Sequence, residues 1–162
     1  MKNTLTIYRG FPASGKSTIA TQWLAEDPNN RIEINRDNTR NLIGISGRIG
    51  TPEQEKLVTK INNTILEDAL SSHKDIVISD TNLRTKHVKE FIKKARTADY
   101  DIKIKDFNNI DIEELIRRDS LRDNGVGEKV LRDMWNRFPY SKWMSLEELE
   151  KSIDSTGNKD AK

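Results

Sequence analysis

Short apolar segments alternate along the chain with longer segments that have helical periodicity. Four of the apolar segments have the length and the β-branched content of strands: residues 5–8 (LTIY), 31–35 (RIEIN), 75–80 (DIVISD) and 101–107 (DIKIKDF). The third is nearly all apolar, which is typical of a strand covered on both faces. The fourth alternates isoleucine with lysine, which indicates a half-exposed strand near an edge. This alternation of strands and helices predicts an α/β fold, a parallel sheet of four to five strands with helices on both faces.

Several helices have recognisable start signals. Three capping boxes are present, at Thr51-x-x-Gln54, Asp111-x-x-Glu114 and Ser145-x-x-Glu148, and the first has proline at the first helical position. A fourth helix is expected over residues 16–26, where apolar residues recur at helical spacing. The helix after the first capping box is expected to bury one stripe, formed by Leu57, Ile61, Ile65, Ala69 and Leu70.

The chain of 162 residues is long enough for one compact domain, and no composition shift divides it. We expect a single domain over residues 1–153, with a lid region at about residues 111–130. Residues 46–50 (SGRIG) are predicted to form a mobile loop, and residues 154–162 (DSTGNKDAK) are predicted to be a disordered tail.

The first predicted strand leads into the stretch GFPASGKS, residues 10–17, which fits the pattern G-x-x-x-x-G-K-[S/T]. In such a P-loop the glycines let successive backbone N–H groups point at phosphate oxygens, and a helix N-terminus follows. Lys16 adds an ammonium group for the outer phosphates, and the hydroxyl of Ser17 is expected to coordinate Mg²⁺. A glycine turn that matches by chance is the alternative, but the strand before and the helix after favour a P-loop NTPase-type fold. The residues expected to bind ATP or another NTP are Gly10, Ala13, Ser14, Gly15, Lys16, Ser17 and Thr18.

Polar residues follow the second predicted strand in the stretch INRDNTR. In open α/β sheets ligands bind beyond the carboxyl ends of the strands, so these side chains are expected at the active site. Asp37 is a candidate general base for an attacking hydroxyl, and Arg40 would share its helix face three residues on. The alternative is an ordinary helix cap followed by a solvent-exposed arginine.

The third predicted strand ends in ISDTN, which places Asp80 and Thr81 at the same edge of the sheet. An acidic group at this position commonly holds the metal, directly or through water. The alternative is a cap for the next helix.

The stretch DIEELIRRDSLRD places Arg118 and Arg122 four residues apart, on one helix face. Arginines of a helix that covers a P-loop can clamp phosphates and neutralise charge in the transition state. Glu114 lies four residues before Arg118, so an ordinary salt bridge is the alternative. The following run DNGVG is expected to break the helix.

Composition limits the partners. The formal net charge is only +2, so any affinity for nucleic acid must come from a local basic patch. The chain contains no cysteine, which excludes disulfides and thiolate chemistry. His73 and His87 lie far apart in polar surroundings and are expected at the surface rather than in a metal site. No long apolar stretch and no signal-peptide pattern are present, so we expect a cytoplasmic protein without a membrane partner.

Four segments in this order, GFPASGKST, INRDNTR, ISDTN and the arginine-containing helix, resemble the kinase domain of T-even phage polynucleotide kinase. The resemblance covers about residues 3–137, and the combination of NRD-x-x-R with SDTN is more restrictive than the P-loop. It implies transfer of the ATP γ-phosphate to the 5′-hydroxyl end of DNA or RNA, in a host cell infected by a phage. The catalytic residues implied by the motif match are Asp37, Lys16 and Arg122. Those implied at the acceptor are Arg40, Asp80 and Thr81, and Arg118 joins Arg122 at the ATP, near its base.

The chain departs from the resemblance in two respects. The lid region after Arg122 differs, with the stretch DNGVGEK, which leaves the base-contacting residues of the lid open. The phage enzyme has a C-terminal phosphatase domain with an Asp-x-Asp motif, which this chain lacks, so a stand-alone kinase is expected. A kinase of a small molecule or nucleotide sugar, as in the toxin-type kinases, is the alternative, and a non-catalytic nucleotide-binding module is a third. The aromatic residues near the C-terminal end either stack on bases or pack on the sheet, and the resemblance leaves self-association through this surface open. These residues are Trp135, Phe138, Tyr140 and Trp143.

Overall fold

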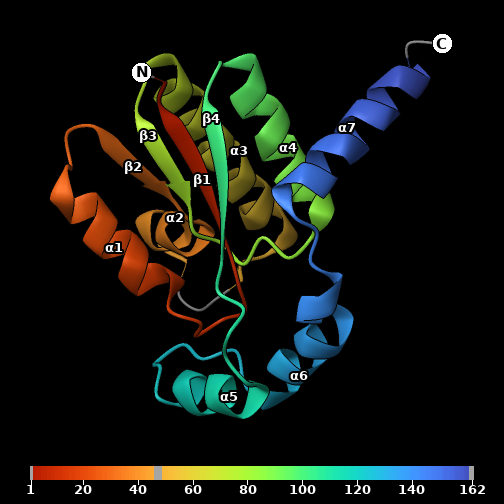
Figure 1. Cartoon of the computed structure of the whole chain (residues 1–162). Coiled ribbons are helices and arrows are strands. Elements are labelled where there is room, and N and C mark those ends of the chain that lie inside the picture. The colour runs from red at the N-terminus through yellow and green to blue at the C-terminus, as the bar shows by residue number, and fades with distance from the viewer. Residues whose placement is uncertain (1, 46–48, 161–162) are drawn as a thin grey trace.

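A four-stranded parallel sheet forms the centre of the molecule (Figure 1). The computed structural model describes residues 2–45 and 49–160. The strand order is β2-β3-β1-β4, so β4 is an edge strand, as its alternating sequence predicts. The strands are β1 (Thr4–Arg9), β2 (Arg31–Ile34), β3 (Asp75–Ile78) and β4 (Asp101–Asp106). The predicted α/β fold and its four strands are therefore confirmed.

Helices cover both faces of this sheet, and α5 and α6 lie beyond the carboxyl ends of the strands (Figure 1). α1 packs on one face, whereas α3, α4 and α7 pack on the other. The described helices are α1 (Lys16–Glu26), α2 (Arg36–Leu42), α3 (Pro52–Ser71), α4 (Thr85–Thr97), α5 (Ile112–Ser120), α6 (Glu128–Arg137), the 3₁₀ turn η1 (Tyr140–Lys142) and α7 (Leu146–Asp160).

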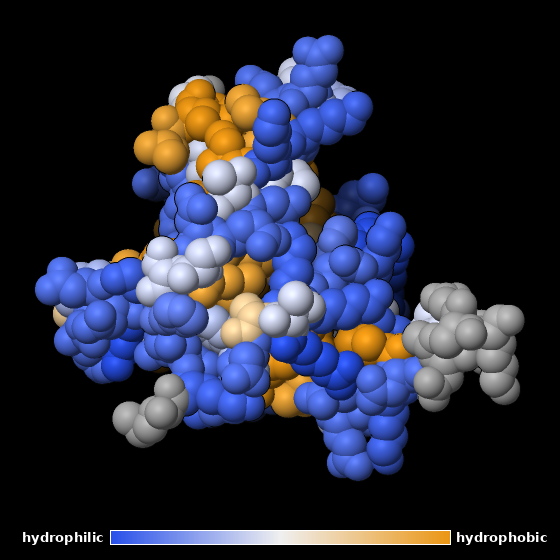
Figure 2. Space-filling view, turned by 90° about the horizontal axis from the view of Figure 1, so that it is seen from above, coloured by the Kyte–Doolittle hydropathy of each residue, from blue (hydrophilic) through white to orange (hydrophobic). Residues whose placement is uncertain are grey.

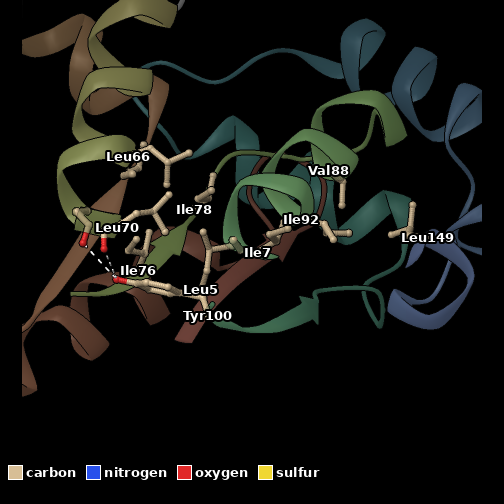
Figure 3. Packing of buried hydrophobic residues seen from close by; sticks show 13 residues of the cluster. Leu5, Ile7, Leu66, Leu70, Ile76, Ile78, Val88, Ile92, Tyr100 and Leu149 are labelled. Carbon is tan, nitrogen blue, oxygen red and sulfur yellow. Dashed lines mark hydrogen bonds between the residues drawn. The ribbon is translucent and has the colours of Figure 1, made fainter. Parts of the chain in front are cut away.

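The main hydrophobic core lies between the sheet and the face formed by α3, α4 and α7 (Figure 3). Leu5 and Ile7 of β1 are fully buried there against Leu66 of α3 and Ile92 of α4. Tyr100 closes one end of this core, and its hydroxyl lies 2.7 Å from the carbonyl oxygen of Lys74. A smaller cluster of Tyr8, Ala20 and Val77 packs under α1 on the other face.

The capping signals have different outcomes. The boxes at Thr51 and Ser145 form as predicted, with reciprocal bonds to Gln54 and Glu148. Asp111 is the N-cap of α5, but its side chain makes no capping hydrogen bond, so the predicted third box is wrong. Glu114 binds Arg117 and Arg118 instead, because guanidinium groups three and four residues further along the helix compete for its carboxylate.

Two further predictions need correction. The buried stripe of α3 is formed by Val58, Leu66, Ala69 and Leu70, and Leu57 is 46 % exposed. Secondary structure continues to Asp160 in α7, which differs from the disordered tail predicted from residue 154, because the helix is extended beyond its buried first turns. Of the loop predicted at residues 46–50, residues 46–48 lie outside the described part.

The C-terminal aromatic residues pack around the P-loop rather than projecting into solvent. The ring of Phe11 is fully buried, and its centroid lies 5.5 to 5.7 Å from those of Trp135, Tyr140 and Trp143. Arg9 joins this cluster, because its guanidinium lies 5.2 Å from the Trp143 ring and pairs with Asp106. The packing interpretation is therefore confirmed for these three aromatic side chains.

The face seen from above in Figure 2, opposite the carboxyl ends of the strands, is largely hydrophilic with a few separate apolar areas. Large apolar side chains that remain exposed are Leu42, Ile49, Leu57, Leu121 and Val130. Within the described residues, no helix is both long and apolar enough to cross a membrane.

We predict that Leu66→Ala lowers the free energy of unfolding by about 3 kcal/mol, because it removes a fully buried side chain and leaves a cavity. The matched control is Leu57→Ala on the exposed side of the same helix, which should change that free energy by less than about 0.5 kcal/mol. Urea unfolding of both variants measures the difference, and equal losses would contradict the observed stripe.

Candidate active site

The P-loop has the geometry that its sequence predicts, and two glycines are essential to it. Gly15 adopts φ 100°, in the left-handed region, as the N-cap of α1. A Cβ at Gly10 would lie 2.7 Å from Oγ of Ser14 and 2.9 Å from Cβ of Phe107, so only glycine fits. The N–H of Gly10 donates to the carbonyl oxygen of Thr81 at 3.0 Å, which ties the loop to the end of β3.

Lys16 is buried inside the loop. Its Nζ donates to the carbonyl oxygens of Gly10 and Phe11 at 2.9 and 2.8 Å, and to Oγ of Ser14 at 3.2 Å. Burial lowers the pKa of Lys16 to about 7, and the nearby charge of Arg122 acts in the same direction. Asp80 and Asp37 oppose this shift of the pKa. Lys16 therefore lies within electrostatic reach of all three predicted site residues.

Asp80 lies at the carboxyl end of β3 and is partly buried. Its Oδ1 accepts a hydrogen bond from the backbone N–H of Arg36 at 2.8 Å, so Asp80 joins the ends of β2 and β3. Burial raises the pKa of Asp80 to about 6, although that hydrogen bond and the charge of Arg36 lower it. The turn is held by Asn82, which has φ 51° and whose amide donates to the carbonyl oxygen of Tyr8 at 2.6 Å.

Asp37 and Arg40 lie together on α2, and a third residue joins them. Nη1 of Arg40 donates to Asp37 at 2.7 Å, whereas Nε and Nη2 bind the two carboxylate oxygens of Glu55 at 3.0 and 2.5 Å. The hydrogen bonds from Arg40 lower the pKa of Glu55 to about 2. Glu55 also accepts from Nη2 of Arg36 and from the N–H of Gly50. The side chain of Arg40 is only 11 % exposed, whereas that of Asp37 is 59 % exposed.

The two predicted lid arginines have different surroundings. Arg118 pairs with Glu114 at 3.0 Å, as the salt-bridge alternative predicts, and also lines a cavity of about 540 Å³ beside the P-loop residues Ser14, Gly15 and Thr18. Arg122 lies just beyond the end of α5 and contacts Asp119 at 3.5 Å. The two arginines are thus not on one continuous helix face, because α5 ends at Ser120.

Asp119 organises the chain that follows α5. Its carboxylate is 3 % exposed and accepts hydrogen bonds from the backbone N–H groups of Val126 and Gly127 at 2.9 and 2.8 Å. These bonds fold residues 121–127, which include Arg122, back onto the end of α5.

A larger cavity of about 730 Å³ is lined in part by Asp80. Asp80, Thr81 and Arg36 form its inner end, and side chains of α3, α4 and α6 form its walls. Asp37 and Arg40 are not among the described residues that line it.

Glu55 and Asp119 were not identified from the sequence as site residues. Glu55 lies fifteen residues from Arg40 in the first turn of α3, and no motif connects the two. Asp119 precedes the predicted break at DNGVG, and an acidic residue before such a turn is the signal that could have identified it.

Comparison with known proteins identifies the family. A model described as "AAA domain" (AAA_33) matches residues 5–140, which is most of the chain. The chain belongs to this AAA domain family. The P-loop of this chain has the N-terminal helix start that the sequence predicts for a phosphate-binding loop. Within the described residues, no group of three histidine, aspartate or glutamate side chains could hold a metal ion.

The similar proteins are kinases or parts of repair assemblies. An L-seryl-tRNA(Sec) kinase of Methanococcus maripaludis is 23 % identical over 137 residues, 83 % of this chain and 52 % of that protein. A chain in the structure of the Pnkp1/Rnl/Hen1 RNA repair complex is 26 % identical with a TM-score of 0.73, over 87 % of this chain and 45 % of that one. An APS kinase CysC of Mycobacterium tuberculosis, in complex with AMPPNP and APS, is 15 % identical with a TM-score of 0.56, over 74 % of this chain and 70 % of that one.

The family model and these similarities agree with the P-loop fold described above. The chain spans about half the length of the seryl-tRNA kinase and of the repair-complex chain. The resemblance to polynucleotide kinases is supported by the repair-complex chain, whereas the T-even phage family itself is not specifically indicated.

We predict that Asp80→Asn stabilises the protein at high pH. Because the pKa of Asp80 is about 6 in the folded protein and 3.8 ordinarily, the folded state holds this proton more tightly, and wild-type stability falls as pH rises between these values. Asparagine keeps Oδ1 for the N–H of Arg36 but does not ionise. The variant should gain roughly 2 to 3 kcal/mol over the wild type between pH 3.5 and pH 8.

Urea unfolding at several pH values measures this gain. Asp68→Asn, on an exposed part of α3, controls for the amide substitution itself. A stability difference between Asp80→Asn and wild type that does not change with pH would contradict the raised pKa.

Proposed function

We propose that this protein is a 5′-hydroxyl polynucleotide kinase that transfers the γ-phosphate of ATP to the 5′-OH end of DNA or RNA. The observation that supports this most is the cavity of about 730 Å³ that is lined by Asp80 and Thr81, since the charge of Asp80 also acts on the P-loop lysine. Its volume and its basic residues Arg36 and Arg84 suit an acceptor that extends away from the reacting hydroxyl. The 26 % identity to a chain of an RNA repair complex supports the same substrate class.

The donor site consists of the P-loop and the region beside it. Backbone N–H groups at the N-terminus of α1 would bind phosphate oxygens, and Lys16 would turn from the loop carbonyls to the outer phosphates. Ser17, exposed in the first turn of α1, would hold Mg²⁺ together with phosphate oxygens and water, and the ion would neutralise charge on the phosphates. The cavity of about 540 Å³ with Arg118 and Phe107 would hold the base.

The acceptor side provides the base and its support. Asp37 would accept the proton of the 5′-hydroxyl as its oxygen forms the new bond to the γ-phosphorus, while the bond to the β-phosphate oxygen breaks and ADP leaves. Arg122 would neutralise charge on the transferred phosphoryl group, since its charge already acts on Lys16. Asp80 and Thr81 would orient the acceptor at the inner end of the cavity.

Arg40 remains the proposed ligand of the acceptor's phosphate, but most of its donors are engaged. Glu55 binds Nε and one N–H of Nη2, and Asp37 binds one N–H of Nη1, which leaves one N–H on each terminal nitrogen. These two remaining donors are available to phosphate oxygens. Arg40 would therefore hold Asp37 and the acceptor at the same time.

A panel of acceptors tests the proposal. The protein is incubated with ATP and Mg²⁺ and with 5′-OH DNA, 5′-OH RNA, nucleoside 3′-monophosphates, nucleosides, seryl-tRNA, adenosine phosphosulfate and nucleotide sugars. Phosphorylation of 5′-OH oligonucleotides with the highest kcat/KM supports the proposal. A small molecule or nucleotide sugar as the best acceptor would support the alternative kinase class.

We predict that Asp37→Asn lowers kcat on a 5′-OH oligonucleotide by roughly 10²-fold or more, since asparagine keeps the size of the side chain but cannot accept the proton. Binding of ATP, measured by isothermal titration calorimetry, should change by less than about threefold. Asp68→Asn is the control, on an exposed part of α3. Loss of ATP affinity with unchanged kcat would make Asp37 a donor-site residue instead.

A further inference from the structure

A second cavity of about 580 Å³ lies next to the larger one. Both are lined by the same segment at the start of α4 and by the C-terminal end of α6. The residues common to the two cavities are Leu83, Arg84, His87, Arg137 and Phe138. These shared residues make the two cavities neighbours, with Asp80 lining the larger one and Lys142 lining the second, which we call the basic groove.

The basic groove is lined by cationic side chains from three segments that are distant in the sequence. Arg84 and Lys86 come from the start of α4, Arg137 from the end of α6 and Lys142 from η1. Arg9, Thr85 and His87 add to the polar lining, and none of the described residues that line the groove is an aspartate or a glutamate. By contrast, the larger cavity also contains the acidic residues Asp80, Glu90 and Asp133.

These cationic groups differ from most arginines of the chain in their pairing. Arg9 is buried and bound to Asp106, so its charge is already balanced. Arg84, Lys86, Arg137 and Lys142 are exposed, and none of them forms an ion pair with a carboxylate of the described residues. Four like charges in one cavity repel one another, so the groove gains stability when it binds an anion.

An aromatic side chain lies where the two cavities meet. Phe138 lines both, and the guanidinium of Arg137 lies 5.1 Å from the centroid of its ring. Phe138 is not part of the aromatic cluster around Phe11, and its ring is only partly buried. Alternation of cationic groups with an aromatic ring is the usual composition of surfaces that bind single strands, where phosphates pair with the cations and bases stack on rings.

We propose that the basic groove binds single-stranded nucleic acid, namely the nucleotides that lie 3′ to the end being phosphorylated. The inference rests on the proposed function and adds to it an acceptor path of several nucleotides with a preference for single strands. Lys86 and Lys142 bind backbone phosphates at the outer end, Arg84 and Arg137 bind them near the larger cavity, and Phe138 stacks on a base between the two. A single strand can offer an unpaired base to Phe138, whereas the bases of a duplex are already paired and stacked on one another.

The test compares acceptors of different length with the full chain. We expect KM to fall at least fivefold from a nucleoside 3′-monophosphate to a single-stranded 5′-OH hexanucleotide, with little change in kcat. In the double variant Lys86→Ala/Lys142→Ala, KM for the hexanucleotide should rise roughly tenfold, while kcat/KM for the 3′-monophosphate stays within twofold. Lys60→Ala/Lys103→Ala removes two exposed lysines outside the groove and is the matched control.

Equilibrium binding gives a second readout that does not depend on catalysis. Fluorescence anisotropy of a labelled single-stranded hexanucleotide gives the association constant at salt concentrations from 50 to 300 mM. The logarithm of this constant falls with the logarithm of the salt concentration, and the slope should be less steep by about 1.4 in the double variant, because two phosphate contacts are lost. A blunt duplex of the same sequence should bind more weakly than the single strand. Equal affinity for both would overturn the preference for single strands.

The outcomes separate the inference from the proposed function. If 5′-OH oligonucleotides are phosphorylated but KM does not depend on their length, the groove is not the acceptor path and the proposed function stands. The same conclusion follows if the double variant lowers kcat/KM equally for short and long acceptors. If no 5′-OH polynucleotide is phosphorylated although the hexanucleotide binds with the lysine-dependent salt slope, the proposed function fails and the groove remains a binding site for single strands. Absence of any lysine-dependent binding overturns the inference.

Discussion

The hydrogen bond from the N–H of Gly10 to the carbonyl oxygen of Thr81 joins the two strands on which the active site is built. β1 and β3 are neighbours and parallel, so their carboxyl ends meet at one edge, and this bond fixes the P-loop relative to Asp80. The bond from Arg36 to Asp80 then fixes the start of α2 to the same point. The positions of the donor loop, the acidic group and the candidate base thus depend on hydrogen bonds that backbone N–H groups donate at the ends of three strands.

Most of the fold could be predicted from the sequence, because the strands have strong apolar patterns and the P-loop requires a strand before it and a helix after it. The position of β4 at an edge followed from its alternation of isoleucine and lysine. The stripe of α3 was misplaced at Leu57 because several neighbouring positions are apolar, and only the angle at which the helix meets the sheet selects Val58 and Leu66. The missing cap at Asp111 has a similar cause, since Glu114 has arginine neighbours that bind it more strongly.

The candidate site was predictable only where a motif fixes it. Lys16, Asp37, Asp80 and Arg122 come within electrostatic reach of one another, because their segments follow strand ends or cover the P-loop. Glu55 was not predictable, since its role depends on how α3 packs against α2. The cavities are also a tertiary property: α3, α4 and α6 form their walls, and no local sequence pattern records that these helices face one another.

The pairing of Arg40 with Glu55 links two positions that no motif connects. Either residue alone would leave a poorly solvated charge, because Arg40 is 11 % and Glu55 22 % exposed. A change at one position is therefore tolerated best when the other changes with it, and the two should vary together among homologues of this chain. An alignment of such homologues would record the contact as a coupled pair of columns, even in proteins whose acceptor differs.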